Sequence, residues 1–196
     1  MKEFCAELAN DQPSPGGGSA SAAAGAMSAS LLAMVCGITA KSKKHEADRP
    51  ELQRVRLELL ALSDELTSLA REDALAYDGV VEAARSRTQP NESEGTRRFG
   101  SALRHAAEVP LKTAAACAQV LELAPQVVAL GKKSASSDIL VAVLLAEAAL
   151  KGAAANVRIN TKDMADLEFV KSSNDRLGSL ERSARKLSRE ALGRIA

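Results

Sequence analysis

The sequence contains no tryptophan, and aromatic residues make up only 2% of its 196 positions. Hydrophobic residues still reach 46% of the chain, so alanine, leucine and valine must supply most of the core. Strands favour β-branched and aromatic residues, whereas alanine and leucine favour helices. The composition therefore predicts an all-α protein, in which any sheet would be a short minority element.

Cysteine and histidine are also scarce, with three and two residues respectively. Cys5, Cys36 and Cys117 lie far apart and lack CxxC spacing, which indicates neither a disulfide framework nor a zinc site. Reduced thiols fit a cytoplasmic location. Because His45 and His105 are the only imidazoles, we expect no dedicated transition-metal site.

Charge of one sign is not in excess, since 26 basic residues face 25 acidic ones and the net charge is +1. Nucleic-acid binding proteins usually carry a basic stripe and often stacking aromatics, so we expect no nucleic-acid partner. The cluster of Lys41, Lys43 and Lys44 could attract an anionic ligand, but it is more typical of a helix C-terminus in water.

One long stretch, 19–40, has no charged residue and is long enough to span a bilayer. It consists mostly of alanine, serine and glycine, which gain little from lipid but allow close packing inside a protein. We therefore predict a buried central helix and no membrane association. The segment before it carries Glu3, Glu7 and Asp11 and does not resemble a signal peptide.

Proline, glycine and capping residues divide the chain into seven predicted helices. They cover 2–9, 19–44 with Ser19 as N-cap, 50–87, 94–123, 125–130, 138–161 and 175–194. Pro110 should kink or break the helix that contains it. The segment 88–94 has only the length of a loop, so we expect a single domain over 1–196, folded as a bundle of five to seven helices.

Two stripes of residues, one small and one apolar, define the predicted helix contacts. Gly25, Ala29, Ala33 and Gly37 recur every four residues, which lets two helix backbones approach closely. The helix over 50–87 has a stripe in steps of three and four, at Leu52, Val55, Leu59, Leu62, Leu66 and Leu69. Continuing these steps places Asp73 on the buried stripe. A buried carboxylate is costly, so Asp73 either pairs with another helix or has a functional role.

Four blocks of sequence resemble a known family. PSPGGGSASAAAGAM at 13–27 is similar to the opening motif of the cyclodeaminase/cyclohydrolase family, which comprises the formiminotransferase-cyclodeaminase C-terminal domain and methenyltetrahydrofolate cyclohydrolases. DALAY at 73–77, AEVPLKTA at 107–114 and SDILVAVLLAEAALKGAAANVRIN at 137–160 match further blocks in order. The resemblance covers about 10–162, whereas 163–196 matches nothing specific. Lys132 and Lys133 stand where many relatives carry Asn, so no contact of that Asn is carried over.

This resemblance implies an all-helical homodimer that acts on a folate. We favour hydrolysis of 5,10-methenyltetrahydrofolate to 10-formyltetrahydrofolate, since this chain shows no fused formiminotransferase domain. The alternative reaction is ring closure of 5-formiminotetrahydrofolate with release of ammonia. A non-catalytic helical dimer on the same fold is a third possibility. Neither reaction implies a metal or a cofactor beyond the tetrahydrofolate substrate.

The residues in the matching blocks suggest a site. Asp73 and Tyr77 lie one turn apart and are the catalytic candidates, because a carboxylate can stabilise the methenyl cation and move a proton. Tyr77 could bind the pterin or orient Asp73. The alternatives are a helix–helix polar contact for Asp73 and a core position for Tyr77.

Substrate binding is predicted at two further places. The loop of Gly16, Gly17, Gly18 and Ser19 precedes a helix, whose N–H groups could bind an anionic group of the ligand or could simply be a flexible entry. Asn156 and Asn160 share a helix face and could bind the pterin or bridge helices. Asp138 lies ~27 Å from Asn156 along this helix and is expected to cap it.

Overall fold

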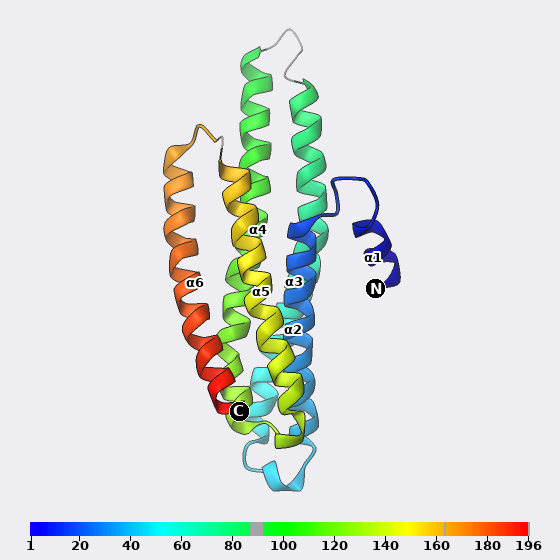
Figure 1. The fold of residues 1–196 in the computed structure, drawn as a ribbon, viewed down its shortest axis with the longest axis vertical. Helices are drawn as coiled ribbons and strands as arrows, with labels where there is room; N and C mark the ends of the chain where they lie inside the picture. The colour runs from blue at the N-terminus through cyan, green and yellow to red at the C-terminus, as the bar shows by residue number, and fades with distance from the viewer. Residues whose placement is uncertain (87–91, 163, 196) are drawn as a thin grey trace.

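The structure is a computed structural model that describes residues 1–86, 92–162 and 164–195. These residues form six α-helices and two short 3-10 turns (Figure 1). The helices are α1 (Lys2–Leu8), α2 (Gly17–Ala40), α3 (Arg49–Ser86), α4 (Glu92–Leu130), α5 (Ser136–Thr161) and α6 (Leu167–Ile195). The turns are η1 (Lys43–His45) and η2 (Lys133–Ala135). The predicted all-α bundle is therefore confirmed, while most of the predicted 88–94 loop lies outside the described residues.

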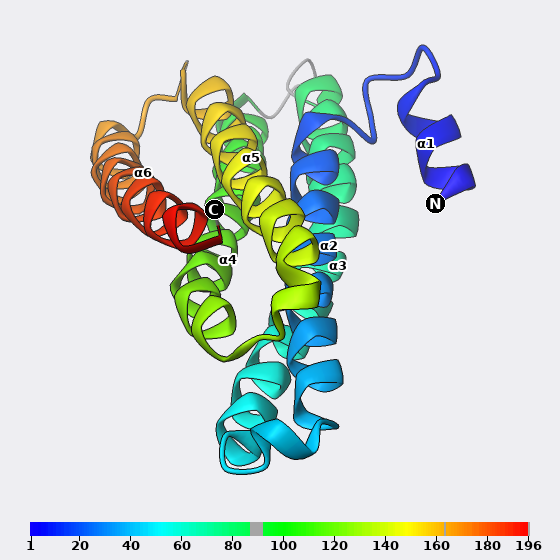
Figure 2. The same ribbon diagram turned by 60° about the horizontal axis from the view of Figure 1, so that its bottom comes forward.

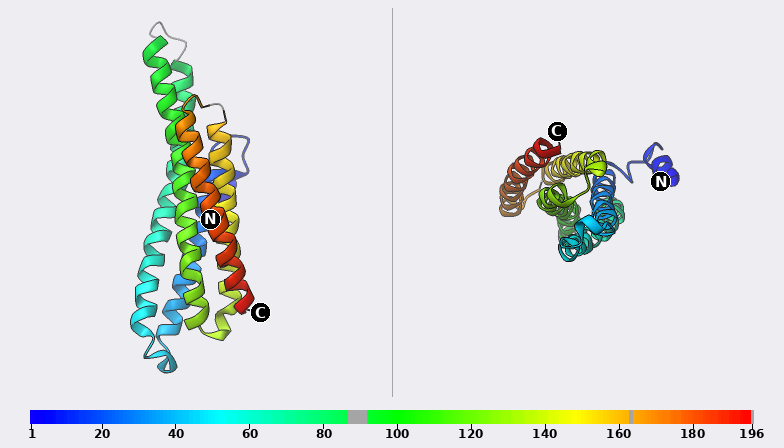
Figure 3. Two further views of the ribbon diagram at one scale, coloured as in Figure 1. Left: turned by 90° about the vertical axis from the view of Figure 1, so that its left-hand side faces the viewer. Right: turned by 90° about the horizontal axis from the view of Figure 1, so that it is seen from below.

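Helices α2, α3, α4 and α5 form the body of the bundle, and α6 packs along α4 and α5 (Figures 2 and 3). Helix α1 stands apart from this body and buries none of its residues. Helix α2 runs antiparallel to both α3 and α5, which brings its first turn close to the end of α5 and to the second half of α3 (Figure 1). This arrangement positions the candidate site.

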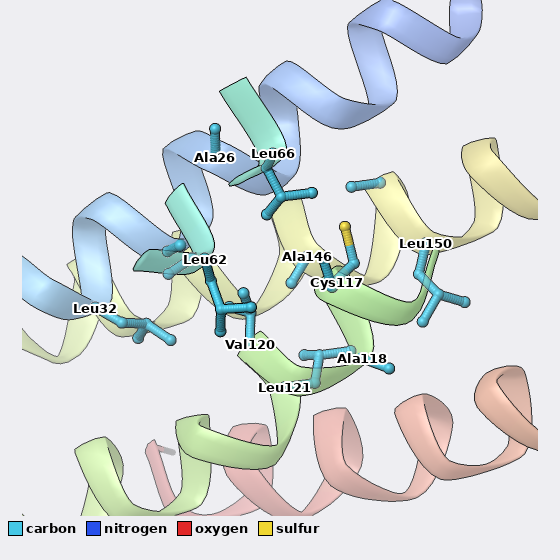
Figure 4. Packing of buried hydrophobic residues seen from close by; sticks show 14 of the residues in the cluster. Ala26, Leu32, Leu62, Leu66, Cys117, Ala118, Val120, Leu121, Ala146 and Leu150 are labelled. Carbon is cyan, nitrogen blue, oxygen red and sulfur yellow. The ribbon is translucent and has the colours of Figure 1, made fainter. Parts of the chain in front are cut away.

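The predicted apolar stripe of α3 is buried along its whole length, from Leu52 to Leu69. Leu62 and Leu66 meet side chains of α4 and α5 in the centre of the bundle (Figure 4). Burying one such leucine contributes roughly 1.5–3 kcal/mol. The small-residue stripe of α2 is also confirmed as a close contact, since a methyl at Gly25 would lie 2.7 Å from Sγ of Cys117.

All three cysteines are free, and two of them are part of this core. Burial raises the pKa of the Cys36 thiol to about 11 and that of Cys117 to about 12. Both thiols therefore stay protonated at neutral pH and act as small apolar side chains.

Helix α4 passes through Pro110 and Pro125 without a break, so a break at Pro110 and the separate helix over 125–130 are wrong, while the kink at Pro110 stays a prediction. Proline removes the donor for the carbonyl four residues earlier, which for Pro110 is the carbonyl of Ala106. The side-chain amide of Asn160 on α5 donates to this carbonyl at 2.6 Å and replaces the lost partner. Packing against the neighbouring helices holds the rest of α4 in register.

Three predicted helix starts also differ from the structure. Helix α2 begins at Gly17 with Gly16 in the capping position, so Ser19 is not the N-cap. Ala135 holds that position for α5, and Asp138 lies within the first turn, where its charge still faces the positive end of the helix. Helix α6 begins eight residues earlier than predicted, because Oδ1 of Asp166 accepts the backbone N–H of Phe169 at 3.0 Å.

Helices α2 and α4 are long and apolar enough to cross a membrane by length and composition alone. In the bundle, however, 56% of the apolar window of α2 and 50% of that of α4 are buried. The burial of α2 agrees with the prediction of a central core helix over this stretch.

Candidate functional site

A pocket of about 290 Å³ lies at the N-terminal end of α2. Its wall is built from the loop before α2 and from α2, α3, α4 and α5. Seven of the eight residues predicted from sequence line it, namely Gly16, Gly17, Gly18, Asp73, Tyr77, Asn156 and Asn160. The eighth, Ser19, is fully buried and hydrogen-bonds Asp73. The structure therefore brings together residues from three of the four matching blocks, and Ala106, which also lines the pocket, directly precedes the fourth block at 107–114.

Asp73 receives two hydrogen bonds from Ser19. The Ser19 hydroxyl donates to Oδ2 at 2.9 Å, and the backbone N–H of the same residue also donates to the carboxylate. Ser19 lies in the first turn of α2, where backbone N–H groups have no partner within the helix. Asp73 of α3 thus caps α2 from outside and lies against the positive end of the α2 dipole.

Gly18 allows this contact. A methyl group at Gly18 would overlap the carboxylate of Asp73, whereas one at Gly17 would make an ordinary contact of 3.6 Å with Asn156. The glycines therefore let the α2 backbone come close to a carboxylate of the same protein. The N–H of Ser19, one of the groups considered for binding an anionic part of the ligand, is directed to Asp73 instead.

Burial raises the pKa of the Asp73 carboxyl above its ordinary value, and the hydrogen bonds from the Ser19 hydroxyl and N–H offset part of this rise. The carboxyl is half-buried, so it contacts both the protein and the pocket. A carboxyl with a raised pKa can accept a proton and return it within one catalytic cycle.

Tyr77 lies one turn after Asp73 on α3 and is 40% exposed. It lines the pocket and is not a core residue, which removes one of the two alternatives for it. The remaining wall consists of Pro13 and Ser14 from the loop before α2 and of the apolar side chains of Val80, Leu103 and Ala106. The sequence analysis assigned neither Val80 nor Leu103 to the site.

Asn156 and Asn160 enter the pocket from the last two turns of α5. Nδ2 of Asn156 donates to the carbonyl of Gly152 at 2.9 Å, and Nδ2 of Asn160 donates to that of Ala106 at 2.6 Å. Asn160 therefore does bridge two helices, and it also lines the pocket. Asp138, at the other end of α5, does not line it.

The other basic candidates lie elsewhere. Helix α2 has 24 residues and is ~36 Å long, so Lys41, at its C-terminal end, is far from the pocket of its own chain. Lys132 is at the same end, where its N–H donates to Oγ1 of Thr39. Lys132 and Lys133 therefore lie away from this pocket. Nε2 of His105 lies 3.8 Å from Oε1 of Glu72, next to Asp73 in sequence. Among the residues described, no three His, Cys, Asp or Glu side chains group in a way that could hold a metal ion.

The model of the formiminotransferase-cyclodeaminase family matches residues 1–179. The chain belongs to this family. The match extends past the 10–162 found from the motifs and includes the beginning of α6.

Individual relatives carry two enzyme names. The chain is 36% identical over 183 residues to a methenyltetrahydrofolate cyclohydrolase of Methylorubrum extorquens, covering 92% of this chain and 86% of the relative. It is 32% identical to the formimidoyltransferase-cyclodeaminase of mouse, of which it spans only 36%. The crystal structure of a formiminotetrahydrofolate cyclodeaminase from Thermotoga maritima superposes with a TM-score of 0.90 at 28% identity, covering 100% of this chain and 94% of that one.

Proposed function

We propose that this family member is a methenyltetrahydrofolate cyclohydrolase, which hydrolyses 5,10-methenyltetrahydrofolate to 10-formyltetrahydrofolate. The observation that carries the proposal is the Asp73 carboxylate, held by Ser19 at the wall of a pocket. The relative of M. extorquens, which this chain matches along most of both lengths, bears the same name.

The substrate is a cation whose charge is shared by N5, N10 and the carbon between them. An ionised Asp73 stabilises this charge and takes a proton as water adds to the carbon. The neutral tetrahedral intermediate then loses its C–N5 bond. Asp73 returns its proton to N5, the hydroxyl proton passes to solvent, and the formyl group stays on N10. One proton is released overall, which balances the lost charge of the substrate.

The raised pKa of Asp73 supports this double role. The carboxyl must be ionised before water attacks, and it must be acidic enough afterwards to protonate N5. Burial on one side and the hydrogen bonds from Ser19 on the other keep its pKa between that of an exposed carboxylate and that of a fully buried one. Because the carbon has the same oxidation level in substrate and product, we propose no cofactor beyond the folate itself.

The alternative reaction is cyclodeamination of 5-formiminotetrahydrofolate. The structural similarity to the Thermotoga enzyme favours it, since the same carboxyl could protonate departing ammonia. The cyclodeaminases of animals are weaker support, because the chain spans about a third of the mouse protein. The third possibility, a scaffold without activity, predicts no turnover of either compound.

An assay of the purified protein with 5,10-methenyltetrahydrofolate distinguishes these functions. Loss of the methenyl absorbance faster than the spontaneous rate supports the cyclohydrolase. If the rate is unchanged, the second substrate to test is 5-formiminotetrahydrofolate. Its ring closure is monitored through the appearance of the methenyl absorbance and the release of ammonia. Absence of both activities would leave the scaffold.

We also propose that the protein is a cytoplasmic homodimer. Apolar side chains on α2 and α5 remain partly exposed in the single chain, among them Met27, Met34 and Ile38 on α2 and Leu140 and Leu144 on α5. Since α2 and α5 pack side by side, these residues can form a continuous apolar face. Apolar patches of this kind are typical of protein–protein interfaces.

A further inference from the structure

Pro110 and Asn160 are connected through a single backbone carbonyl. An α-helical carbonyl accepts the N–H of the residue four positions later, and for Ala106 that residue is Pro110, which has no N–H. Helix α4 nevertheless continues through this point. Nδ2 of Asn160 donates to the Ala106 carbonyl at 2.6 Å, so the α5 side chain supplies the missing donor.

This bond fixes which end of the Asn160 amide faces the pocket. Only the nitrogen of an amide can donate to a carbonyl, so the assignment of the nitrogen and oxygen follows from the chemistry of the contact. The oxygen remains as the group that Asn160 offers to a ligand. Asn156 is arranged in the same way, because its nitrogen donates to the carbonyl of Gly152 and its oxygen remains.

Asn156 and Asn160 therefore present amide oxygens to the pocket as acceptors. The two amide oxygens belong to residues one turn apart on α5, and Asp73 adds a carboxylate. The side chains of Val80, Leu103 and Ala106 offer no donor, whereas the hydroxyls of Tyr77 on α3 and Ser14 in the loop before α2 belong to other parts of the wall, and that of Ser14 donates to the Ala74 carbonyl. A ligand edge that carries N–H donors satisfies such a wall, whereas an edge that carries only acceptors would leave buried oxygens facing each other.

We propose that Pro110 positions Asn160, and that this makes the pocket select ligands by a donor edge of two adjacent N–H groups. The identity of the ligand rests on the proposed function. In a tetrahydrofolate, this edge is the 2-amino group together with N3–H of the pyrimidine ring. Pro110 contributes because it has no N–H to donate to the Ala106 carbonyl. An N–H at position 110 would pair with this carbonyl, and the Asn160 amide could then turn either its nitrogen or its oxygen toward the pocket.

The first test is a double-mutant cycle measured by thermal unfolding, which needs no ligand. Asn160→Ala, Pro110→Ala and the double variant are compared with the wild type by calorimetry. In the wild-type background, Asn160→Ala leaves the Ala106 carbonyl unpaired and should lower Tm by about 3–8 °C. In the Pro110→Ala background the N–H of residue 110 can donate to the Ala106 carbonyl. Asn160→Ala should therefore lower Tm by less than about 2 °C. Equal losses in both backgrounds would overturn the proposal.

Two matched controls accompany this cycle. Asn156→Ala should cost the same with and without Pro110, because the Gly152 carbonyl does not depend on that proline. Pro125→Ala should leave the cost of Asn160→Ala unchanged, because Pro125 affects the carbonyl of Leu121 instead. If Asn160→Ala does not fold, Asn160→Ser enters the same cycle.

The second test measures selectivity by calorimetric titration with 5-formyltetrahydrofolate and its 2-desamino analogue. The wild type should bind the 2-amino compound at least about tenfold more tightly. Asn160→Ala and Pro110→Ala should each reduce this ratio to about threefold or less. A wild type that binds neither compound, or a ratio that both variants leave unchanged, would overturn the donor-edge selection. Selective binding without any turnover would instead contradict only the proposed reaction.

Discussion

The hydroxyl of Ser19 donates a hydrogen bond of 2.9 Å to Oδ2 of Asp73, from the first turn of one helix to the middle of another. Three consecutive glycines form the N-cap and the first two residues of α2, and the carboxylate of Asp73 occupies the space that a side chain at Gly18 would need. The glycine loop, the small-residue helix and the acidic residue are therefore parts of one arrangement. It holds the Asp73 carboxylate at the edge of a pocket, and no basic side chain among the described residues forms an ion pair with it, so its charge is available to a cationic substrate.

Asp73→Asn should remove the proton acceptor and preserve the fold. We expect kcat for methenyl hydrolysis to fall by about 10²–10⁴. Tm should change by only a few degrees, because the Asn oxygen can still accept from Ser19. Asp78→Asn is the matched control, since Asp78 is an exposed aspartate of the same helix and should retain activity. Full activity in Asp73→Asn would remove this residue from the mechanism.

Ser19→Ala should shift the pH dependence of the reaction. The Ser19 hydroxyl lowers the pKa of Asp73, so its removal raises that pKa further. Because the ionised carboxylate is the active form, activity should begin to fall at a higher pH as the solution is acidified. The measurement is the acid limb of kcat/KM against pH, with the exposed Ser30→Ala as control. An acid limb that does not move would show that another group controls it.

Gly18→Ala should affect the site more than the small size of the added methyl group suggests. The added methyl overlaps the Asp73 carboxylate, so either the carboxylate or the start of α2 must move. A displacement of about 1 Å can reduce turnover by about 10²-fold. Gly79→Ala serves as control, since a methyl at this position of α3 meets nothing within 4 Å. Equal activities of the two variants would contradict the steric role of Gly18.

Much of the fold follows from patterns that are local in sequence. The stripe from Leu52 to Leu69 and the small residues of α2 predicted their packing correctly, because helical periodicity alone decides which side chains share a face. The start of α6 was placed too late, although Asp166 is a preferred capping residue and the apolar Leu167, Phe169 and Val170 follow it.

The site was predicted for a different reason, namely the resemblance of four sequence blocks to one family. Residue patterns alone left Asp73 and Tyr77 undecided between structural and functional roles. The partner of Asp73 could not be found in this way, since Ser19 was expected to cap its own helix. The continuity of α4 could not be predicted from the sequence either, because the partner of the Ala106 carbonyl is Asn160, which is far away in sequence. Such contacts depend on tertiary geometry.

The crossing of α2 and α5 offers a test of packing. A methyl at Gly152 would overlap Oγ of Ser21, while it would lie 3.5 Å from Cβ of the same residue. Gly152→Ala should therefore destabilise the protein by about 1–3 kcal/mol. Adding Ser21→Ala removes the oxygen and should restore most of this loss, although Ser21→Ala alone costs its bond to the Gly17 carbonyl. Chemical denaturation of the two single variants and the double variant measures the coupling, and additive losses would contradict the proposed overlap.

The proposed dimer depends on the apolar face of α2 and α5. Met34 is 42% exposed and Leu144 is 50% exposed in the single chain, which leaves both side chains in water unless a second copy covers them. The wild type should therefore sediment as a dimer at micromolar concentration. Met34→Glu and Leu144→Glu should each shift it to monomer, because a charge without a partner is costly inside an interface. Leu57→Glu is the matched control: Leu57 is 67% exposed on α3, outside this face, and its replacement should leave the dimer intact. A wild type that sediments as a monomer would contradict the proposal, and dissociation by Leu57→Glu would place the interface on α3 instead.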